Sequence, residues 1–270
     1  MHRIITFLKD NLLINLSLIL IYYIAVVVLH DEVGAMINGS FDSITRDSYN
    51  NIILVATILG GCVMGILLFK RYKVHPRRQL LTLLLVYSLV AIVTSFSILF
   101  VINIEAIHFV QYAILAILIY PLTQSATATM ILGTIAGAVD ELYQYLVIDT
   151  SAKYYDFNDV FLDSVGLGLG LLCIAILGMA FVKRQGSWYK RAECVLLIII
   201  VTILIVLAFL GEFHINLDPN APAGFTLFKM APQGFWHYPG GPYARFHILT
   251  PIPGLLLIGL TNWVYARLDK

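Results

Sequence analysis

Long apolar blocks separated by short polar segments make up most of the chain. Eight such blocks can be delimited, each 18 to 25 residues long, at residues 11–29, 51–69, 80–102, 105–122, 127–148, 158–182, 192–210 and 247–265. About 20 apolar residues are enough for a helix to cross the hydrocarbon core of a bilayer. The pattern therefore predicts an all-α protein, a polytopic transmembrane helix bundle of about eight spans. Pro251 and Pro253 are expected to kink the first turns of the last span.

The composition agrees with a membrane protein. Hydrophobic residues make up 60% of the chain and charged residues only 12%, whereas a soluble domain has about 25% charged residues. The formal net charge is +1, so nucleic acid is not expected as a partner. The expected partner of these apolar surfaces is the lipid bilayer, and the sequence indicates no oligomeric state.

The distribution of positive charges predicts how the spans are oriented. Of the 17 Lys and Arg residues, 13 fall on the side of the membrane that holds both chain ends in an eight-span arrangement. The other four are Arg46, Lys153, Lys229 and Arg245. Positively charged loops stay in the cytoplasm during insertion. We therefore expect a multi-pass membrane protein with both termini in the cytoplasm.

The chain divides into three segments by the kind of span it contains. Residues 1–103 hold the N-terminal spans, residues 104–182 form a core with most of the intramembrane polar residues, and residues 183–270 hold the last two spans. The last segment includes a predicted extracytoplasmic loop, 211–246, with five aromatic residues: Phe235, Trp236, Tyr238, Tyr243 and Phe246. Such a loop is expected either to lie at the membrane interface or to cover a cavity as a lid.

Polar residues on three spans of the core segment are expected to meet. They are Glu105, His108 and Tyr112 on the fourth span, Asp140, Glu141 and Gln144 on the fifth, and Asp156, Asp159 and Asp163 at the start of the sixth. A rise of 1.5 Å per residue places His108, Tyr112, Asp140 and Asp163 about 6 to 12 Å below the outer boundary. This common depth predicts one polar cavity that opens to the outside.

The carboxylates of this set outnumber the nearby cations, which are His108 and Lys153. An ionised carboxylate at mid-membrane costs on the order of 2.5–3.5 kcal/mol. Some of the acids must therefore be protonated or be balanced by a bound cation. That leaves three uses open, namely a divalent metal site, a proton site, or an acid/base pair acting on a substrate. No cofactor is indicated beyond a divalent cation.

Structural roles compete with these functional ones. Asp156 and Asp159 also fit the capped start of a helix, Glu105 fits a helix cap, and His108 fits an interfacial histidine. Asp140 and Glu141 have no helix end nearby. Because adjacent helical residues point about 100° apart, we expect Glu141 to be the more buried functional acid. Asp140 is expected to set its charge or to bind the neighbouring helix.

Three short motifs in residues 105–170 resemble the VanZ-like family of bacterial membrane proteins. The first is His108, Phe109 and Tyr112, and the second is Asp140, Glu141 and Gln144. The third comprises Asp159, Asp163, Gly166 and Gly170. Two positions depart from the family pattern, since Lys153 is the only cation of the loop where the family often has arginine, and Asp163 replaces an asparagine. Both changes make the site more acidic.

The resemblance implies a multi-pass protein of the bacterial cytoplasmic (inner) membrane. It also implies a link to the cell envelope and to low-level resistance to the glycopeptide teicoplanin. It supplies no established reaction. The expected function is therefore that of an envelope membrane protein whose outward-facing acidic cavity binds a lipid-linked or glycopeptide-like ligand. Two alternatives stay open: a membrane-embedded acid/base or metal-dependent enzyme acting on envelope lipids, and a cation- or proton-coupled transporter.

Overall fold

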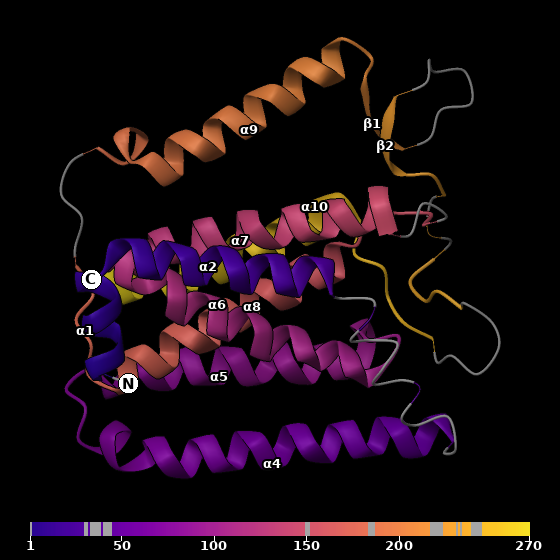
Figure 1. Cartoon of the computed structure of the whole chain (residues 1–270). Helices are drawn as coiled ribbons and strands as arrows, with labels where there is room; N and C mark the ends of the chain where they lie inside the picture. Colours follow the sequence, from indigo (N-terminus) through magenta and orange to yellow (C-terminus); the bar gives the residue numbers. More distant parts are fainter. Residues whose placement is uncertain are drawn as a thin grey trace.

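The chain folds into a bundle of roughly parallel and antiparallel helices with a small two-stranded sheet at one end (Figure 1). The computed structural model describes residues 2–29, 32, 39, 45–148, 152–182, 187–216, 224–230, 232, 234–238 and 245–270. The helices are α1 (His2–Asp10), α2 (Leu12–Val28), α4 (Arg46–Lys73), α5 (Arg78–Thr94), α6 (Ile107–Thr123), α7 (Ala126–Tyr143), α8 (Phe157–Ile176), α9 (Ala192–Phe209) and α10 (Pro251–Tyr265). The all-α prediction is confirmed.

Shorter helical turns extend several of these helices. Two π-helical turns, η1 (Ser95–Leu99) and η3 (Gln144–Ile148), continue α5 and α7. Three 3₁₀ turns are η2 (Asn103–Ala106), η4 (Trp188–Lys190) and η5 (Ala266–Asp269). With these turns included, the observed helices cover the predicted blocks 51–69, 80–102, 105–122, 127–148 and 192–210 to within a few residues.

Six helices in the described part of the chain are long and apolar enough to cross a membrane: 46–73, 78–99, 103–123, 126–148, 157–176 and 192–209. A seventh span results if α1 and α2, which are bent by 106° relative to each other, count as one. The prediction of about eight spans thus exceeds this count. When the α1–α2 pair counts as a span, the one predicted span that is not counted is α10, whose 15 residues are fewer than a full crossing needs.

Two predicted spans have different ends in the structure, and local chemistry explains both. The span predicted at 158–182 ends at Ile176, because Gly178 adopts a positive φ of 82°, which stops a helix. The span predicted at 247–265 begins only at Pro251. Proline is well placed in the first turn of a helix, where its missing N–H would have no partner. The expected kink within this span was therefore wrong, since Pro251 and Pro253 start the helix.

Helix α8 is the centre of the bundle. It packs against α5, α6, α7 and α10 and is buried along most of its length. Its glycines permit this packing, because a Cβ at Gly166 would lie 2.9 Å from the carbonyl oxygen of His108, and a Cβ at Gly254 of α10 would lie 2.8 Å from Phe157. One hydrophobic core combines residues from all three chain segments, including Ile5, Leu81, Tyr112, Leu171 and Tyr265.

Helices α4 and α9 lie at the periphery (Figure 1). Their side chains are exposed around most of the helix circumference, and most of those side chains are apolar. A helix that is apolar on all faces is suited to contact with lipid. The two helices therefore flank the compact group of α2, α5, α6, α7, α8 and α10.

The sheet was not anticipated from the sequence. Strands β1 (Phe213–Asn216) and β2 (Phe225–Phe228) pair in parallel, with Phe213 opposite Phe225. They belong to the loop predicted at 211–246, of which residues 217–223, 231, 233 and 239–244, Tyr243 among them, lie outside the described residues. Phe228 is buried and its ring stacks on those of Phe157 and Tyr154, so β2 is fixed to the start of α8.

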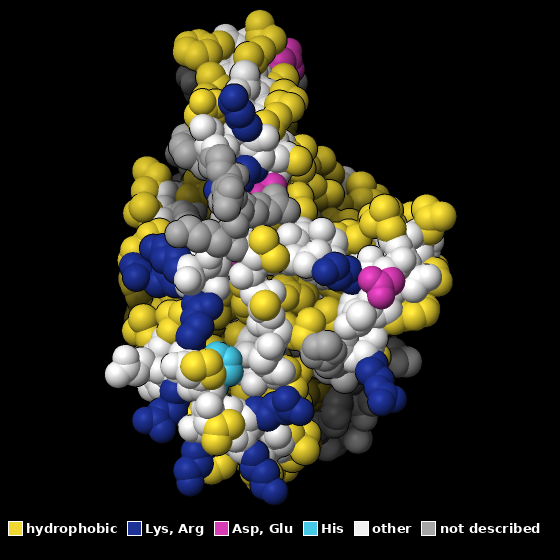
Figure 2. All heavy atoms as spheres, turned by 90° about the vertical axis from the view of Figure 1, so that its left-hand side faces the viewer, with side chains coloured by type: hydrophobic (Ala, Val, Ile, Leu, Met, Phe, Trp, Pro, Cys, Tyr) yellow, Lys and Arg dark blue, Asp and Glu magenta, His cyan; other side chains and the backbone are white. Residues whose placement is uncertain are grey.

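Both chain ends lie at the end of the bundle opposite the sheet (Figure 1). Figure 2 shows this face, on which Lys and Arg side chains are frequent and Asp and Glu side chains are few. Basic residues at this end include Lys73, Arg77, Arg78, Lys190 and Arg267, which lie where helices end or begin. The charge asymmetry predicted from the sequence is therefore also an asymmetry of the folded molecule.

Candidate functional site

His108 of α6 forms the centre of a buried polar cluster with two aspartates of α8. Its Nδ1 lies 2.8 Å from Asp163 Oδ1, and its Nε2 lies 3.7 Å from Asp159 Oδ2. His108 is 2% exposed and Asp163 is fully buried. The spacing of four between Asp159 and Asp163 puts both carboxylates on the α8 face that meets α6. The imidazole is thus held between two carboxylates.

Asp140 and Glu141 of α7 contact different partners. Asp140 accepts a hydrogen bond of 3.1 Å from the hydroxyl group of Tyr112 on α6. The side-chain amide of Gln144 donates to both acids, over 3.2 Å to Asp140 Oδ1 and 3.1 Å to Glu141 Oε1. Both acids are buried, with exposures of 0% for Asp140 and 3% for Glu141. The expectation that Glu141 is the more buried was therefore wrong, whereas Asp140 does bind a neighbouring helix.

Glycines on α7 and α8 bring the three helices close enough for these contacts. A Cβ at Gly137 would lie 2.6 Å from Asp163 Oδ2, and a Cβ at Gly166 would lie 3.0 Å from Tyr112 Cβ. Real Cβ contacts are longer than these values, so a side chain at either position would push α8 or its carboxylate away. The small residues therefore set the geometry of the polar cluster.

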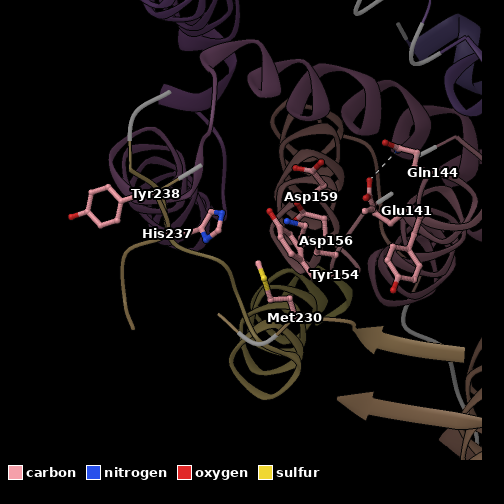
Figure 3. A pocket seen from close by; sticks show the side chains of 11 residues that line it. Glu141, Gln144, Tyr154, Asp156, Asp159, Met230, His237 and Tyr238 are labelled. Atoms are coloured by element: carbon pink, nitrogen blue, oxygen red, sulfur yellow. Dashed lines mark hydrogen bonds between the residues drawn. The ribbon is translucent and has the colours of Figure 1, made fainter. Parts of the chain in front are cut away.

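A cavity of about 560 Å³ lies directly beside this cluster, at the end of the bundle that carries the sheet (Figure 3). Glu141 and Gln144 of the α7–η3 helix border one side, and His237 and Tyr238 lie on the opposite side. The remaining lining residues come from η3, from the segment before α8, from α8 itself and from the segment after β2: Tyr145, Ala152, Lys153, Tyr154, Asp156, Asp159 and Met230.

The cavity is lined by several carboxyl groups, and burial together with their charges raises the pKa values of neighbouring acidic groups. Burial and the neighbouring carboxylate of Asp159 raise the pKa of Asp156 to about 7, although hydrogen bonds from the backbone of Asn158 and Asp159 act in the opposite direction. Burial, followed by the charges of Asp156, Asp159 and Glu105, raises the pKa of the Tyr154 hydroxyl well above its usual range. The Tyr154 hydroxyl therefore remains a neutral hydrogen-bonding group near neutral pH.

The structure separates the predicted site residues into three groups. Glu141, Gln144 and Asp159 line the cavity, while His108, Tyr112, Asp140 and Asp163 form the buried layer behind it. Glu105 has a local role, because its carboxylate accepts hydrogen bonds from the backbone N–H groups of Val101 and Ile102 at 3.2 and 3.3 Å. The alternative interpretation of Glu105 as a helix cap thus describes its contacts.

Asp156 also has the structural role that was one of its two interpretations. Its side chain accepts a hydrogen bond of 2.8 Å from the backbone N–H of Asn158 and so caps α8. It lines the cavity as well, so the two roles coincide. Sequence reasoning missed six lining residues: Tyr145, Ala152 and Tyr154 near α7 and α8, and Met230, His237 and Tyr238 of the loop 211–246. The last three were the hardest to find. The only signal for them was the aromatic-rich composition of the loop.

The chain matches no protein-family model, no curated protein and no solved structure. The resemblance to the VanZ-like family therefore depends on the motif residues alone. Those residues, which span positions 108 to 170 in the sequence, lie on three helices that pack against one another.

Two kinds of chemistry are compatible with this arrangement. One donor atom from each of His108, Glu141 and Asp163 lies within 4.8 Å of the other two, so the three residues could hold a metal ion. Glu141 also borders the cavity, so it can exchange a proton with a molecule bound there while it lies next to the His108–Asp163 pair. Both uses need the buried layer and the cavity to act together.

Proposed function

We propose that this chain is a VanZ-like integral membrane protein of the bacterial cell envelope whose acidic cavity binds a lipid-linked or glycopeptide-like ligand, which links it to low-level teicoplanin resistance. The observation that carries the proposal is the cavity itself. Residues of α7, α8 and the loop after β2 border a space of about 560 Å³ beside the buried polar cluster. This volume is typical of small-molecule sites.

The lining indicates which part of such a ligand enters. Glu141, Asp156 and Asp159 contribute three carboxyl groups, whereas Lys153 contributes one amine. An ammonium group of the ligand would find charge partners here, and its hydroxyl or aromatic groups would find Tyr154 and Tyr238. A lipid headgroup or a single amine-bearing part of a glycopeptide fits this space, while the rest of the ligand lies outside the cavity.

The charge distribution supports an outward-facing cavity. Basic residues gather at the end of the bundle that holds the chain termini (Figure 2), and the cavity lies at the opposite end. The positive-inside rule would place the basic end in the cytoplasm. A cavity on the outer side of the membrane would be accessible to envelope precursors and to antibiotics.

One arrangement of residues favours a second function. The chain could be a membrane-embedded acid/base enzyme that acts on envelope lipids. Glu141 borders the cavity, and the buried His108–Asp163 pair lies directly behind it. A paired acid and imidazole next to a substrate-sized space is a common catalytic arrangement. The transporter alternative gains no such support, because the bent α1–α2 pair has its bend at the end away from the cavity.

The test is to express the chain in a teicoplanin-sensitive Gram-positive host and to measure the minimum inhibitory concentration. We expect the wild-type chain to raise it, and Glu141→Gln and Asp159→Asn to abolish the increase at equal protein level. Glu193→Gln is the matched control, since Glu193 is also buried, at 3% exposure, but lies on the peripheral helix α9. Resistance that persists in Glu141→Gln and Asp159→Asn would refute a role for the cavity.

The same cells distinguish binding from catalysis. If the protein only binds its ligand, the lipid extract of cells that express the wild-type chain should match that of cells with the Glu141→Gln variant in mass spectrometry. A lipid species that is consumed or formed only with the wild-type chain would favour the enzyme. Binding measurements on the purified protein in nanodiscs would then identify the ligand. Binding of fluorescent teicoplanin would indicate the glycopeptide, and binding of vesicles rich in an amine-bearing phospholipid would indicate a lipid headgroup.

A further inference from the structure

We propose that His108, Glu141 and Asp163 form a binding site for one divalent transition-metal ion at the base of the cavity. The three residues come from three helices, α6, α7 and α8, and all three are buried. One donor atom of each lies within 4.8 Å of the other two. The proposal deepens the proposed function, since the ion would lie where the ligand enters, but it can be tested without any ligand.

The donor set fits such an ion. One imidazole nitrogen and two carboxylate oxygens are ligands that Zn²⁺, Fe²⁺ and Mn²⁺ accept. Two ligands bound to Zn²⁺ at tetrahedral angles are about 3.3 Å apart. The 2.8 Å between His108 Nδ1 and Asp163 Oδ1 is close to that value, so these two atoms need only separate slightly to share an ion. The three donor atoms lie within 4.8 Å of one another, so Glu141 needs to move by at most about 1.5 Å to reach that spacing, which is a small shift for its side chain.

A buried oxygen without a hydrogen-bond partner indicates where a metal ion would bind. Asp163 Oδ2 is fully buried and has no hydrogen-bond partner within the described residues. It is directed at Gly137 of α7, where a Cβ would lie 2.6 Å away. Glu141 is on the same face of α7, one turn further along. A buried carboxylate oxygen without a partner is costly. A cation held between His108 and Glu141 by both oxygens of the Asp163 carboxylate would remove that cost.

The charge of the cluster also calls for a cation. In the described part of the chain, the ion pairs of Asp159 and of Asp163 are both made with His108. A single imidazole thus faces two aspartates, and Glu141 and Asp140 lie next to it on α7. Buried charges in proteins are normally paired or coordinated to a metal. A divalent ion would balance two of these carboxylates.

The surrounding residues are arranged as an outer shell. With Nδ1 bound to the ion, the Nε2–H of His108 faces Asp159 Oδ2, at 3.7 Å, in the manner of a carboxylate–histidine–metal arrangement. Gln144 donates to Glu141 Oε1 and fixes its orientation. Three protein ligands leave a coordination position free, and because Glu141 borders the cavity, that position faces the ligand space.

The experiment uses the full chain, purified in detergent, treated with a chelator and dialysed against Zn²⁺ or Mn²⁺ alone. We expect about one ion per chain by elemental analysis. Calorimetry should show affinity lowered by more than about tenfold in His108→Asn, Glu141→Gln and Asp163→Asn. Glu193→Gln should bind as the wild-type chain does. Binding that is unchanged in the three ligand variants, or no stoichiometric binding by the wild-type chain, overturns the proposal.

Two further measurements cover the case in which a ligand variant fails to fold. X-ray absorption of the Zn²⁺-loaded wild-type chain should show nitrogen and oxygen neighbours with the signature of one imidazole. A spectrum without imidazole would contradict the assignment. Gly137→Ala keeps every metal-binding side chain but displaces Asp163 Oδ2, so it should also lower the affinity for the metal ion. Gly61→Ala should leave that affinity unchanged, because a Cβ at Gly61 would meet nothing within 4 Å. Equal affinities in these two variants would count against the proposed geometry.

Failure of this test and failure of the proposed function have different signatures. A chain that binds no metal but still raises teicoplanin resistance in a Glu141-dependent way retains its cavity function. A chain that binds one ion at His108 but confers no resistance retains its metal site.

Discussion

At the scale of single residues, the adjacent acids Asp140 and Glu141 show how one helix serves two neighbours. The angle of about 100° between consecutive side chains directs Asp140 to Tyr112 on α6 and Glu141 to the cavity. Gln144, one turn later, holds both acids through a single amide. The two acids in the last turn of α7 therefore have separate roles, one in packing and one in the site.

Asp156 is expected to make cavity binding dependent on pH. Its pKa of about 7 lies above the usual value of 3.8, so the side chain is mostly neutral at pH 6 and mostly ionised at pH 8. A quaternary alkylammonium probe, whose charge does not titrate, should bind more tightly at pH 8 than at pH 6, by about fivefold for an added interaction of about 1 kcal/mol. Fluorescence titration of the purified chain measures this.

Asp156→Asn is the matched variant for that experiment. Asparagine is as good a helix cap as aspartate, so α8 keeps its N-terminus while the titration is removed. We expect the affinity of this variant to vary much less between pH 6 and 8. The stability of the fold should change with pH in the opposite direction to probe affinity. Because the pKa of Asp156 is higher in the folded state than in the unfolded chain, its ionisation lowers the stability as the pH rises from about 4 to about 7. Probe affinity that falls from pH 6 to pH 8 would contradict this role.

The residues of the site could be predicted where helix periodicity determines their positions. His108, Glu141 and Asp163 were expected to meet because their spacing and depth agreed, and they do meet. Glu105 was expected to join them from the outer end of the same span as His108, but its carboxylate accepts hydrogen bonds from the backbone N–H groups of Val101 and Ile102, a contact that depends on the turn before α6. His237 and Tyr238 could not be placed, since no periodicity relates an irregular loop to a helix bundle.

At the scale of the elements, the end of the chain caps the start of α7. The Asp269 carboxylate accepts hydrogen bonds from the backbone N–H groups of Ala126 and Thr127, at 2.6 and 2.9 Å, and from the Ser125 hydroxyl at 2.8 Å. Arg77 fixes η5 in turn by donating to the carbonyl oxygens of Arg267 and Leu268. The helix that carries Glu141 thus depends on a contact far away in the sequence.

Asp269→Ala is therefore expected to destabilise the bundle. Loss of a helix cap costs about 1–2 kcal/mol, which lowers the midpoint of thermal unfolding by roughly 2–4 °C per kcal/mol. Thermal unfolding in detergent measures the change. Asp10→Ala, which removes an exposed carboxylate from α1 at the same end of the molecule, should have little effect. A midpoint that falls equally in both variants would show that the cap contributes nothing specific.

The helices themselves were largely predictable, and their ends less so. Apolar blocks of the right length correspond to α4, α5, α6, α7 and α9. The end of α8 depends on the positive φ of Gly178, and the start of α10 depends on Pro251. Strands β1 and β2 have only four residues each, too few for an alternating pattern to be recognised. A Cβ at Gly61 or Gly65 of α4 would meet nothing within 4 Å, so these two glycines do not mark a close helix contact within the described residues.

At the scale of the whole molecule, the two ends of the bundle differ in charge and in content. The end with the chain termini carries the basic residues, and the other end carries the sheet and the cavity (Figures 1 and 2). Sequence patterns predicted this polarity because inserted loops are sorted by their positive charge. The number of spans was harder to predict, since length and apolarity alone do not show that α10 has only 15 residues.

Reporter fusions can determine which end faces the cytoplasm. Position 188 lies in η4, just before α9, and position 225 begins β2, beyond the other end of α9. A reporter fused after residue 188 is expected to be active in the cytoplasm, and one fused after residue 225 outside the membrane. If both report the same side, α9 does not cross the membrane and the assignment of the cavity to the outer face is wrong.

The contact between Asp269 and α7 has a consequence for biosynthesis. Ala126 and Asp269 are separated by 143 positions. During translation, α6, α7 and α8 therefore leave the ribosome long before the carboxylate that caps α7 has been made. Until then the first turn of α7 lacks that cap, although the Ser125 hydroxyl already accepts one hydrogen bond from the backbone N–H of Ala128. The helices that carry the polar cluster consequently reach their final stability only after synthesis has passed residue 269, and ribosome-bound intermediates should be the form of this protein most exposed to quality-control proteases.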